Sequence, residues 1–175
     1  MNYMMIRTDD MLNGEGLRVV LFCTACDHYC KNCHNPETWQ ASNGKLFDEN
    51  AKLQIFNELE KDYISGLTIS GGDPLNINNL KDVCELCKEV KERYSDKTIW
   101  LYTGYKWEDI IDEINAWHQD ELILSQIVNN IDVLVDGKFV EELADVKYPW
   151  AGSTNQKVID VKKSLEQNEV VLWCD

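Results

Sequence analysis

Short apolar runs alternate with amphipathic stretches along most of the chain, and this alternation restricts the folds open to it. Four runs have the length and composition of buried strands: residues 18–23, 67–70, 98–102 and 131–135. Between them, apolar side chains recur at helical spacing over residues 48–63, 77–94 and 107–114. Strands that alternate with helices pair in parallel through right-handed crossovers, so the sequence predicts an α/β fold.

The length of 175 residues suits one domain, and we expect a single domain over residues 1–175. The sequence contains no internal repeat and no low-complexity linker that would mark a boundary. The strand–helix units are too few to close an eight-stranded barrel, so we expect a partial barrel or an open, mostly parallel sheet. Residues 157–161 form either a last strand or an irregular tail.

Both architectures collect ligands at the carboxyl ends of the parallel strands. Four loops follow the expected strands: the cysteine-rich segment 24–38, Gly71-Gly72-Asp73-Pro74, Thr103-Gly104-Tyr105 and Asp136-Gly137-Lys138. Neighbouring glycines let a ligand approach the backbone closely, and exposed carbonyls or Asp73 can accept a hydrogen bond from an ammonium group. We therefore expect these loops to converge on a pocket for a small polar molecule.

The charge balance excludes several classes of partner. The chain has 17 basic and 31 acidic residues, a formal net charge of −14, whereas nucleic acids and anionic membranes attract basic surfaces. No apolar run approaches the length of about 18 residues that spans a bilayer, and residues 1–10 lack a signal-peptide core. We expect a cytoplasmic protein whose seven cysteines stay reduced, so their role is not to form disulfides.

Four of the cysteines fall within eleven residues, which indicates metal or redox chemistry. The run Cys26-x3-Cys30-x2-Cys33 offers three thiolates, too few to saturate a four-iron cluster, and an iron left open suits catalysis. The alternative is a zinc-binding interaction module that also recruits Cys23. Spacing alone leaves both readings open, although Cys23 ends an apolar strand and is expected to point into the core.

The other cysteines carry weaker signals. Cys84 and Cys87 fall on the apolar stripe of the helix expected over 77–94, where free cysteine packs as a small hydrophobe. We expect both to be core residues. Cys174 has no assigned role, and neither His28 nor His34 is assigned as a ligand.

The cysteine spacing resembles that of the radical S-adenosylmethionine (SAM) enzymes. Further pieces of sequence resemble the activating proteins of anaerobic (class III) ribonucleoside-triphosphate reductases. They are NGEGLR at 13–18, CHNPETW at 33–39, SGGDPL at 70–75, YTGY at 102–105, VDGKF at 135–139 and GSTNQ at 152–156. Each piece is short, and their number and order over most of the chain make the resemblance specific.

The resemblance implies a partial (β/α) barrel of the radical SAM type and an enzyme with two cofactors. A 4Fe–4S cluster on Cys26, Cys30 and Cys33 would chelate SAM through its open iron. Reductive cleavage of SAM would yield a 5′-deoxyadenosyl radical that makes a glycyl radical on the reductase large subunit, with a flavodoxin-like protein as electron donor. The implied SAM contacts are Asn32, Cys33, His34, Gly72, Asp73, Thr103 and Gly104.

Four positions depart from the family pattern. Glu15 stands where proline is usual, Asn32 where an aromatic residue or glycine is commoner, Ala151 for a frequent arginine, and Cys23 for an apolar residue. None of these changes removes an expected cluster ligand. The nearest rival within the superfamily is an activating enzyme of the pyruvate formate-lyase type, which usually carries Gly-Gly-Glu where this chain has Gly-Gly-Asp.

Overall fold

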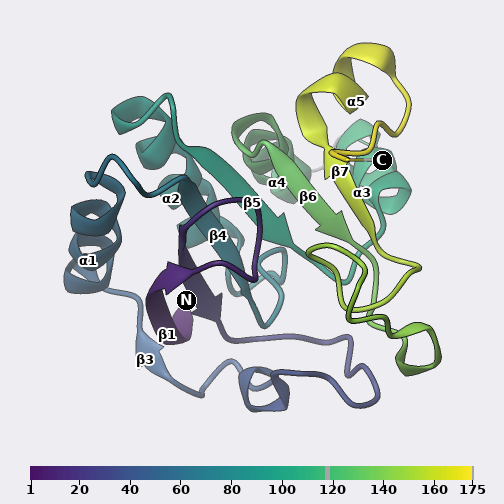
Figure 1. Cartoon of the computed structure of the whole chain (residues 1–175), viewed down its shortest axis with the longest axis horizontal. Helices are drawn as coiled ribbons and strands as arrows, with labels where there is room; N and C mark the ends of the chain where they lie inside the picture. The colour runs from purple at the N-terminus through teal and green to yellow at the C-terminus, as the bar shows by residue number, and fades with distance from the viewer. Residues whose placement is uncertain (117–118, 175) are drawn as a thin grey trace.

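A seven-stranded sheet forms the centre of the computed structural model, which describes residues 1–116 and 119–174 (Figure 1). The order of strands across the sheet is β3-β1-β2-β4-β5-β6-β7. Their bounds are β1 (Asn2–Asp10), β2 (Arg18–Cys23), β3 (Lys45–Leu46), β4 (Gly66–Gly71), β5 (Thr98–Tyr102), β6 (Val133–Asp136) and β7 (Lys157–Asp160).

The middle of the sheet is parallel and its flanks are antiparallel. Strands β2, β4, β5 and β6 pair in parallel, while β1 with β3 on one flank and β7 on the other run antiparallel to their neighbours. The predicted α/β class and the parallel centre are confirmed. The partial barrel of the radical SAM type stays a prediction, because the described strands form a sheet whose ends, β3 and β7, are not paired with each other.

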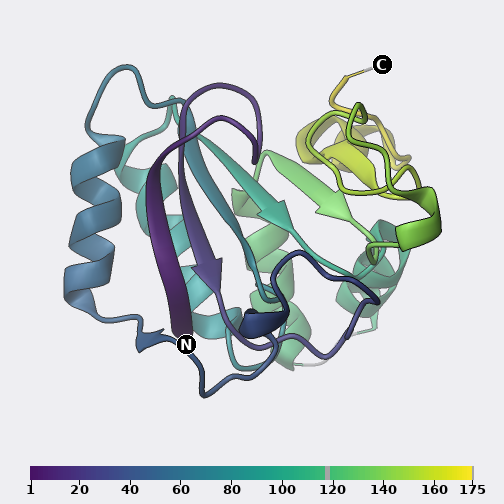
Figure 2. The same ribbon diagram turned by 60° about the horizontal axis from the view of Figure 1, so that its bottom comes forward.

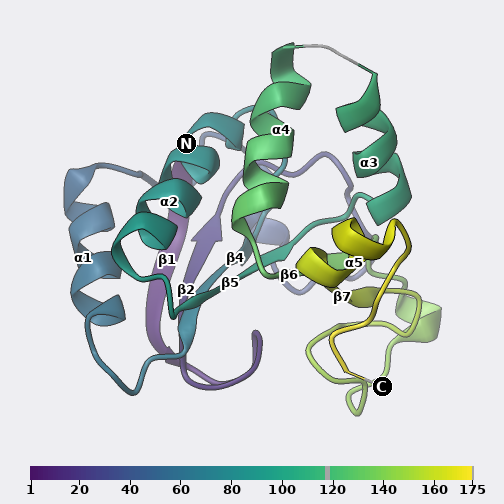
Figure 3. The ribbon, with the colours of Figure 1, turned by 90° about the horizontal axis from the view of Figure 1, so that it is seen from above.

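Five α-helices are present in the described residues, and those that follow β3, β4 and β5 cover one face of the sheet (Figure 3). Their bounds are α1 (Glu49–Leu59), α2 (Leu80–Arg93), α3 (Trp107–Asn115), α4 (Gln119–Asn130) and α5 (Val161–Gln167). Asp48 caps α1 as its sequence indicated, because its carboxylate accepts a hydrogen bond from the amide of Ala51 at 3.0 Å. None of the described helices is long and apolar enough to cross a membrane.

The structure adds four elements to those that the sequence predicted: strands β1 and β3 and helices α4 and α5. Of the two alternatives for residues 157–161, the last strand is the one observed, as β7 over residues 157–160. Strand β1 is half exposed and carries charged residues, so it lacks the uniform apolar run of a central strand. Helices α3 and α4 follow one another without an intervening strand, which breaks the simple alternation.

The two faces of the sheet carry different side chains, because successive residues of a strand point to opposite sides. On the face under the helices, residues such as Leu21, Ile69 and Leu101 join one large apolar core. On the other face, the same strands carry Trp100, Tyr102, Val133, Val135 and Val158, against which Trp150 and Trp173 pack. We call the first the helix face and the second the open face.

A fully buried arginine anchors the amino-terminal ends of the strands on the open face. The guanidinium of Arg18 donates to the hydroxyl of Thr68 at 2.7 Å and to the carbonyls of Leu67 and Thr98 at 2.8 Å. It also lies 5.4 Å from the ring centre of Trp100. Burial is the main reason why the pKa of Arg18 falls to about 10, so the residue is still charged at neutral pH.

Candidate functional site

A cavity of about 670 Å³ extends along the open face of the sheet. All four loops that the sequence placed at one rim contribute to its wall, among them Cys26, Gly72, Thr103, Gly104 and Gly137. Figure 2 shows the indigo cysteine loop along the carboxyl ends of the parallel strands and the green segment after β6 beside it. The predicted convergence of these loops is confirmed.

The three cysteines of the Cys-x3-Cys-x2-Cys run all border this cavity as free, partly exposed thiols. Each directly follows a residue with left-handed backbone: Ala25 at φ 69°, Tyr29 at φ 48° and Asn32 at φ 53°. A left-handed conformation costs a non-glycine residue about 1 kcal/mol, so the fold holds this loop against local preference. The repeated left-handed turn brings the thiols to one side of the loop, toward the cavity.

The donor chemistry of the cavity fits an iron–sulfur group. Its wall supplies three thiols and no Asp or Glu side chain, a soft set that suits iron–sulfur clusters rather than magnesium or calcium. Among the described residues no three His, Cys, Asp or Glu side chains are already grouped to hold a metal ion. Burial raises the pKa of Cys26 to about 11, so binding must displace its proton.

Cys23 lies apart from these three cysteines. It is fully buried, its thiol donates to the carbonyl of Ser70 at 3.2 Å, and burial raises its pKa. It does not border the cavity, so a zinc site that combines it with the other three finds no support in the geometry. Cys84 and Cys87 are buried in the apolar core of the helix face, as expected.

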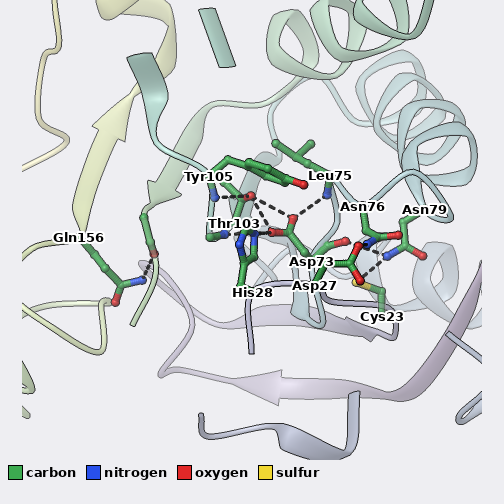
Figure 4. Close-up of polar contacts among 12 residues, drawn as sticks. Cys23, Asp27, His28, Asp73, Leu75, Asn76, Asn79, Thr103, Tyr105 and Gln156 are labelled. Carbon is green, nitrogen blue, oxygen red and sulfur yellow. Dashed lines mark hydrogen bonds and ion pairs between the residues drawn. The ribbon is translucent and has the colours of Figure 1, made fainter. Parts of the chain in front are cut away.

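Asp73 ties three of the loops together beneath the cavity (Figure 4). Its carboxylate is buried and accepts hydrogen bonds from the amides of Leu75 at 2.8 Å and Gly104 at 3.0 Å, and from the hydroxyl of Thr103 at 2.9 Å. The Nε2 atom of His28 lies 2.5 Å from the same carboxylate. Because His28 lies between two of the expected cluster ligands, this contact fixes the cysteine loop to β4 and β5.

Two glycines make the close approach of the cysteine loop possible. A Cβ atom on Gly72 would lie 2.8 Å from the carbonyl oxygen of Ala25, and one on Gly104 would lie 2.3 Å from the ring of His28. The sequence predicted that glycines here admit a ligand. In the structure the space beside both is taken by the cysteine loop itself, although both still border the cavity.

The remaining expected SAM contacts divide between the cavity and its surroundings. Cys33, His34 and Thr103 border the cavity, with the ring of His34 packed 5.0 Å from that of Phe139. Asn32 is exposed outside it, where its side-chain amide contacts Glu141. Asp73 faces its protein partners rather than the cavity, so any effect on a ligand passes through Thr103 and Gly104.

Several wall residues were missed by the sequence reasoning. Gln156 links two parts of the segment between β6 and β7. Its amide nitrogen donates to the carbonyl of Gly137 at 2.8 Å, and its amide oxygen accepts from the amide of Gly152 at 2.9 Å. Tyr102 lines the cavity and donates to the carbonyl of Trp150 at 2.7 Å. The GSTNQ run at 152–156 was the available signal, but the sequence gave no partner for its glutamine.

Comparisons with known proteins found a matching family model and similar chains. A family model described as a 4Fe-4S single cluster domain matches residues 12–159. A protein of Enterobacteria phage T4 is 42% identical over 158 residues, covering 90% of this chain and 93% of its own. Proteins of Haemophilus influenzae and Escherichia coli K12 are 41% and 40% identical, covering 89% and 90% of this chain and 96% and 97% of their own. All three are named anaerobic ribonucleoside-triphosphate reductase-activating protein.

Proposed function

The chain belongs to the family of anaerobic ribonucleoside-triphosphate reductase-activating proteins, and we propose that it is a radical SAM enzyme acting on such a reductase. It would cleave SAM reductively and leave a glycyl radical on the reductase large subunit. The observation that carries the proposal is the cysteine loop, in which three free thiols, each after a left-handed residue, border one cavity without a carboxylate in its wall.

Three thiolates of this loop, from Cys26, Cys30 and Cys33, would hold a 4Fe–4S cluster. When bound, such a cluster supplies the electron that breaks the bond between sulfur and C5′ of SAM. The remaining steps depend on placement, which is the task of the protein. The Asp73–His28 contact holds the loop in position. Groups that support metal ligands in this way typically change metal affinity by roughly 10- to 100-fold.

The wall of the cavity supplies groups suited to SAM. The backbones of Gly72, Thr103 and Gly104 border the side nearest Asp73, where they would meet the methionine part. Cys33 and His34, with Asn32 next to them, would lie on the adenine side. Asp73 would act on the methionine part indirectly, because its carboxylate already accepts hydrogen bonds from Thr103 and Gly104.

The proposed reaction needs an electron donor and a source of the hydrogen atom. The electron would come from a flavodoxin-like protein, and the hydrogen atom removed by the 5′-deoxyadenosyl radical would come from a glycine of the reductase. All seven cysteines are free thiols, which suits a reducing cytoplasm.

The test starts from protein purified without oxygen and loaded with iron and sulfide. We expect about four irons per chain, 5′-deoxyadenosine on reduction with SAM, and a glycyl radical signal in electron paramagnetic resonance when the reductase is added. Cys30→Ala should lose the iron and the 5′-deoxyadenosine, whereas the matched Cys84→Ala variant should keep both. Formation of 5′-deoxyadenosine by Cys30→Ala at the wild-type rate would overturn the ligand assignment.

The choice of substrate separates this function from its nearest rival. Pyruvate formate-lyase replaces the reductase in a parallel reaction, with all other components unchanged. We expect the radical signal on the reductase alone. A signal on pyruvate formate-lyase and none on the reductase would reassign the substrate while leaving the radical SAM chemistry in place.

A further inference from the structure

Three large apolar side chains that border the cavity are exposed to solvent. Met11 and Leu12, in the loop after β1, are 70% and 77% exposed, and Val146, in the segment before β7, is fully exposed. All three border the cavity. In Figure 2 the purple loop after β1 lies at the opposite end of the strands from the indigo cysteine loop. We call Arg7, Met11, Leu12, Val146 and Lys147 the outer rim.

The exposed tip of the loop after β1 is held rigidly. One carboxylate oxygen of the buried Asp10 accepts hydrogen bonds from the amides of Leu12 and Asn13, both at 2.8 Å, and from the side chain of Asn13 at 2.9 Å. The other oxygen pairs with Arg7 at 2.8 Å. These hydrogen bonds fix the backbone at Met11 and Leu12 while their side chains remain exposed to solvent. A fixed backbone lowers the entropy cost of binding a partner.

The charge of the cavity is opposite to that of the whole chain. Its wall contains Arg7, Lys138 and Lys147 and no acidic side chain, although the chain carries 31 Asp and Glu residues and a net charge of −14. Arg7 is paired with Asp10. In the described part of the chain, neither Lys138 nor Lys147 lies within ion-pair distance of a carboxylate, so both are available to an anionic partner.

We propose that the outer rim is the docking surface for a polypeptide segment of the reductase that carries apolar side chains beside acidic ones. This inference rests on the proposed function. The cavity is continuous from the outer rim to the three cysteines, so an extended segment anchored at Met11, Leu12 and Val146 enters the space where SAM would be cleaved. Lys147 at the rim would then pair with an acidic residue of the segment.

The reductase is a better occupant of this surface than the electron donor. Removal of a hydrogen atom requires the reacting atoms to be in contact, at about 3–3.5 Å, so the glycine segment must enter the cavity. An electron donor has no such requirement and can dock on the outer surface near the cysteine loop. The cavity is lined by residues from the loop after β1 as well as from the cysteine loop, a span that suits an extended chain.

The main experiment compares two variants in which exposed apolar residues are replaced. The double variant Met11→Ser/Leu12→Ser alters the outer rim, and Leu53→Ser, on α1 and 53% exposed, is the matched control. Glycyl radical formation is measured against reductase concentration, and 5′-deoxyadenosine is measured without reductase, both with dithionite as the electron source. We expect the KM for the reductase to rise about tenfold or more in the double variant, with unchanged 5′-deoxyadenosine formation and no change in Leu53→Ser.

A second variant tests the charge of the rim. Lys147→Glu should raise the KM for the reductase, and added salt should raise the KM of wild type but have less effect on that of the variant, because salt screens attraction between exposed charges. A KM for the double variant within twofold of that of Leu53→Ser would overturn the proposal. So would a defect that appears only when a flavodoxin replaces dithionite, since the rim would then dock the electron donor.

Direct binding separates this proposal from the proposed function. The loaded wild-type protein and the double variant are each titrated with reductase, and the complex is measured by sedimentation. Weaker binding by the double variant supports the docking surface even if no radical forms, in which case only the proposed function fails. Equal binding by both proteins overturns the docking surface even if radical formation is normal.

Discussion

The helix face and the open face of the sheet are built from the same strands, yet only the helix face could serve as an ordinary protein core. Its core joins mostly aliphatic side chains of the strands and helices with Cys84 and Cys87 of α2, and it contains none of the expected cluster ligands. The open face buries Arg18, carries aromatic side chains and borders the cavity. The two faces differ in that the main apolar core lies on one side of the layer of strands and the candidate site on the other.

The largest expected effect is the loss of activity when a cysteine of the cysteine loop is replaced, compared with a cysteine of the helix face. Cys26→Ala and Cys33→Ala should each lower the yield of 5′-deoxyadenosine more than about 100-fold, because loss of a ligand exceeds the usual effect of its supporting groups. Cys23→Ala, on the helix face, should keep its iron. Iron and sulfide analysis of the three purified variants decides the matter. Iron loss in Cys23→Ala to the level of the other two would break the division between the faces.

The next effect concerns the stability that the open face contributes. Arg18→Met should lower the free energy of unfolding by about 3 kcal/mol or more, because it leaves buried carbonyls of β4 and β5 without their donor. Chemical denaturation of the iron-free chain measures this change. Arg93→Met, an exposed arginine on α2, is the control and should cost far less. Equal effects of the two substitutions would show that the buried Arg18 network adds no more to stability than an exposed arginine does.

A smaller effect is expected from loss of the contact between His28 and Asp73, which joins the cysteine loop to the loop after β4. His28→Ala should leave the folded chain intact but shorten the time for which it retains iron by about tenfold, because the cysteine loop loses its hold on Asp73. Iron release to a chelator, followed at neutral pH, measures retention without reference to activity. His34→Ala, which removes a ring packed on Phe139, is the comparison variant. Retention equal to wild type in His28→Ala would contradict a positioning role.

Within the helix face, Cys87→Ala should lower the free energy of unfolding by about 1 kcal/mol, because it opens a small cavity at a fully buried position. Its iron content should equal that of wild type. Thermal unfolding with iron analysis of the same sample provides both values. A loss of iron without a loss of stability would reverse the assignment of this cysteine.

The smallest effect is a pH dependence at the outer rim. Burial tends to raise the pKa of Asp10, but hydrogen bonds from Asn13 and Arg7 outweigh it and hold the pKa below its ordinary value of 3.8. A carboxyl group with a lowered pKa contributes stability above the ordinary value and loses it as the pH falls toward the lowered one. Asp10→Asn should therefore be less stable than wild type by about 1 kcal/mol at pH 5–8, and the difference should shrink below pH 3.8. A difference that grows in acid would contradict this assignment.

The sequence predicted the parallel centre because β2 and β5 stand out as apolar runs, and β4 is a short strand that two glycines end. It missed β1, because the exposed and charged positions of this strand interrupt its apolar pattern. It also missed α4, because no glycine or proline separates it from α3. The local sequence pattern predicts a strand well where both of its faces are buried. It predicts poorly where a strand is partly exposed or where two helices follow one another.

For the site, topology alone placed four loops at one rim, since the carboxyl ends of parallel strands lie together. The direction of the Asp73 side chain was beyond prediction, because it depends on His28 and Thr103, which come from other loops. The outer rim was missed for a similar reason: Met11 and Val146 are 135 positions apart in the printed sequence, and no periodicity links them.

The apolar core of the helix face does not depend on Cys26, Cys30 or Cys33, and this affects how the protein would respond to loss of iron. Small metal-dependent domains unfold when their metal is removed, because binding and folding are one process. Here the apolar core contains none of Cys26, Cys30 and Cys33. If these cysteines hold the proposed cluster, a chain that loses its iron to oxygen would keep its fold and could bind a new cluster.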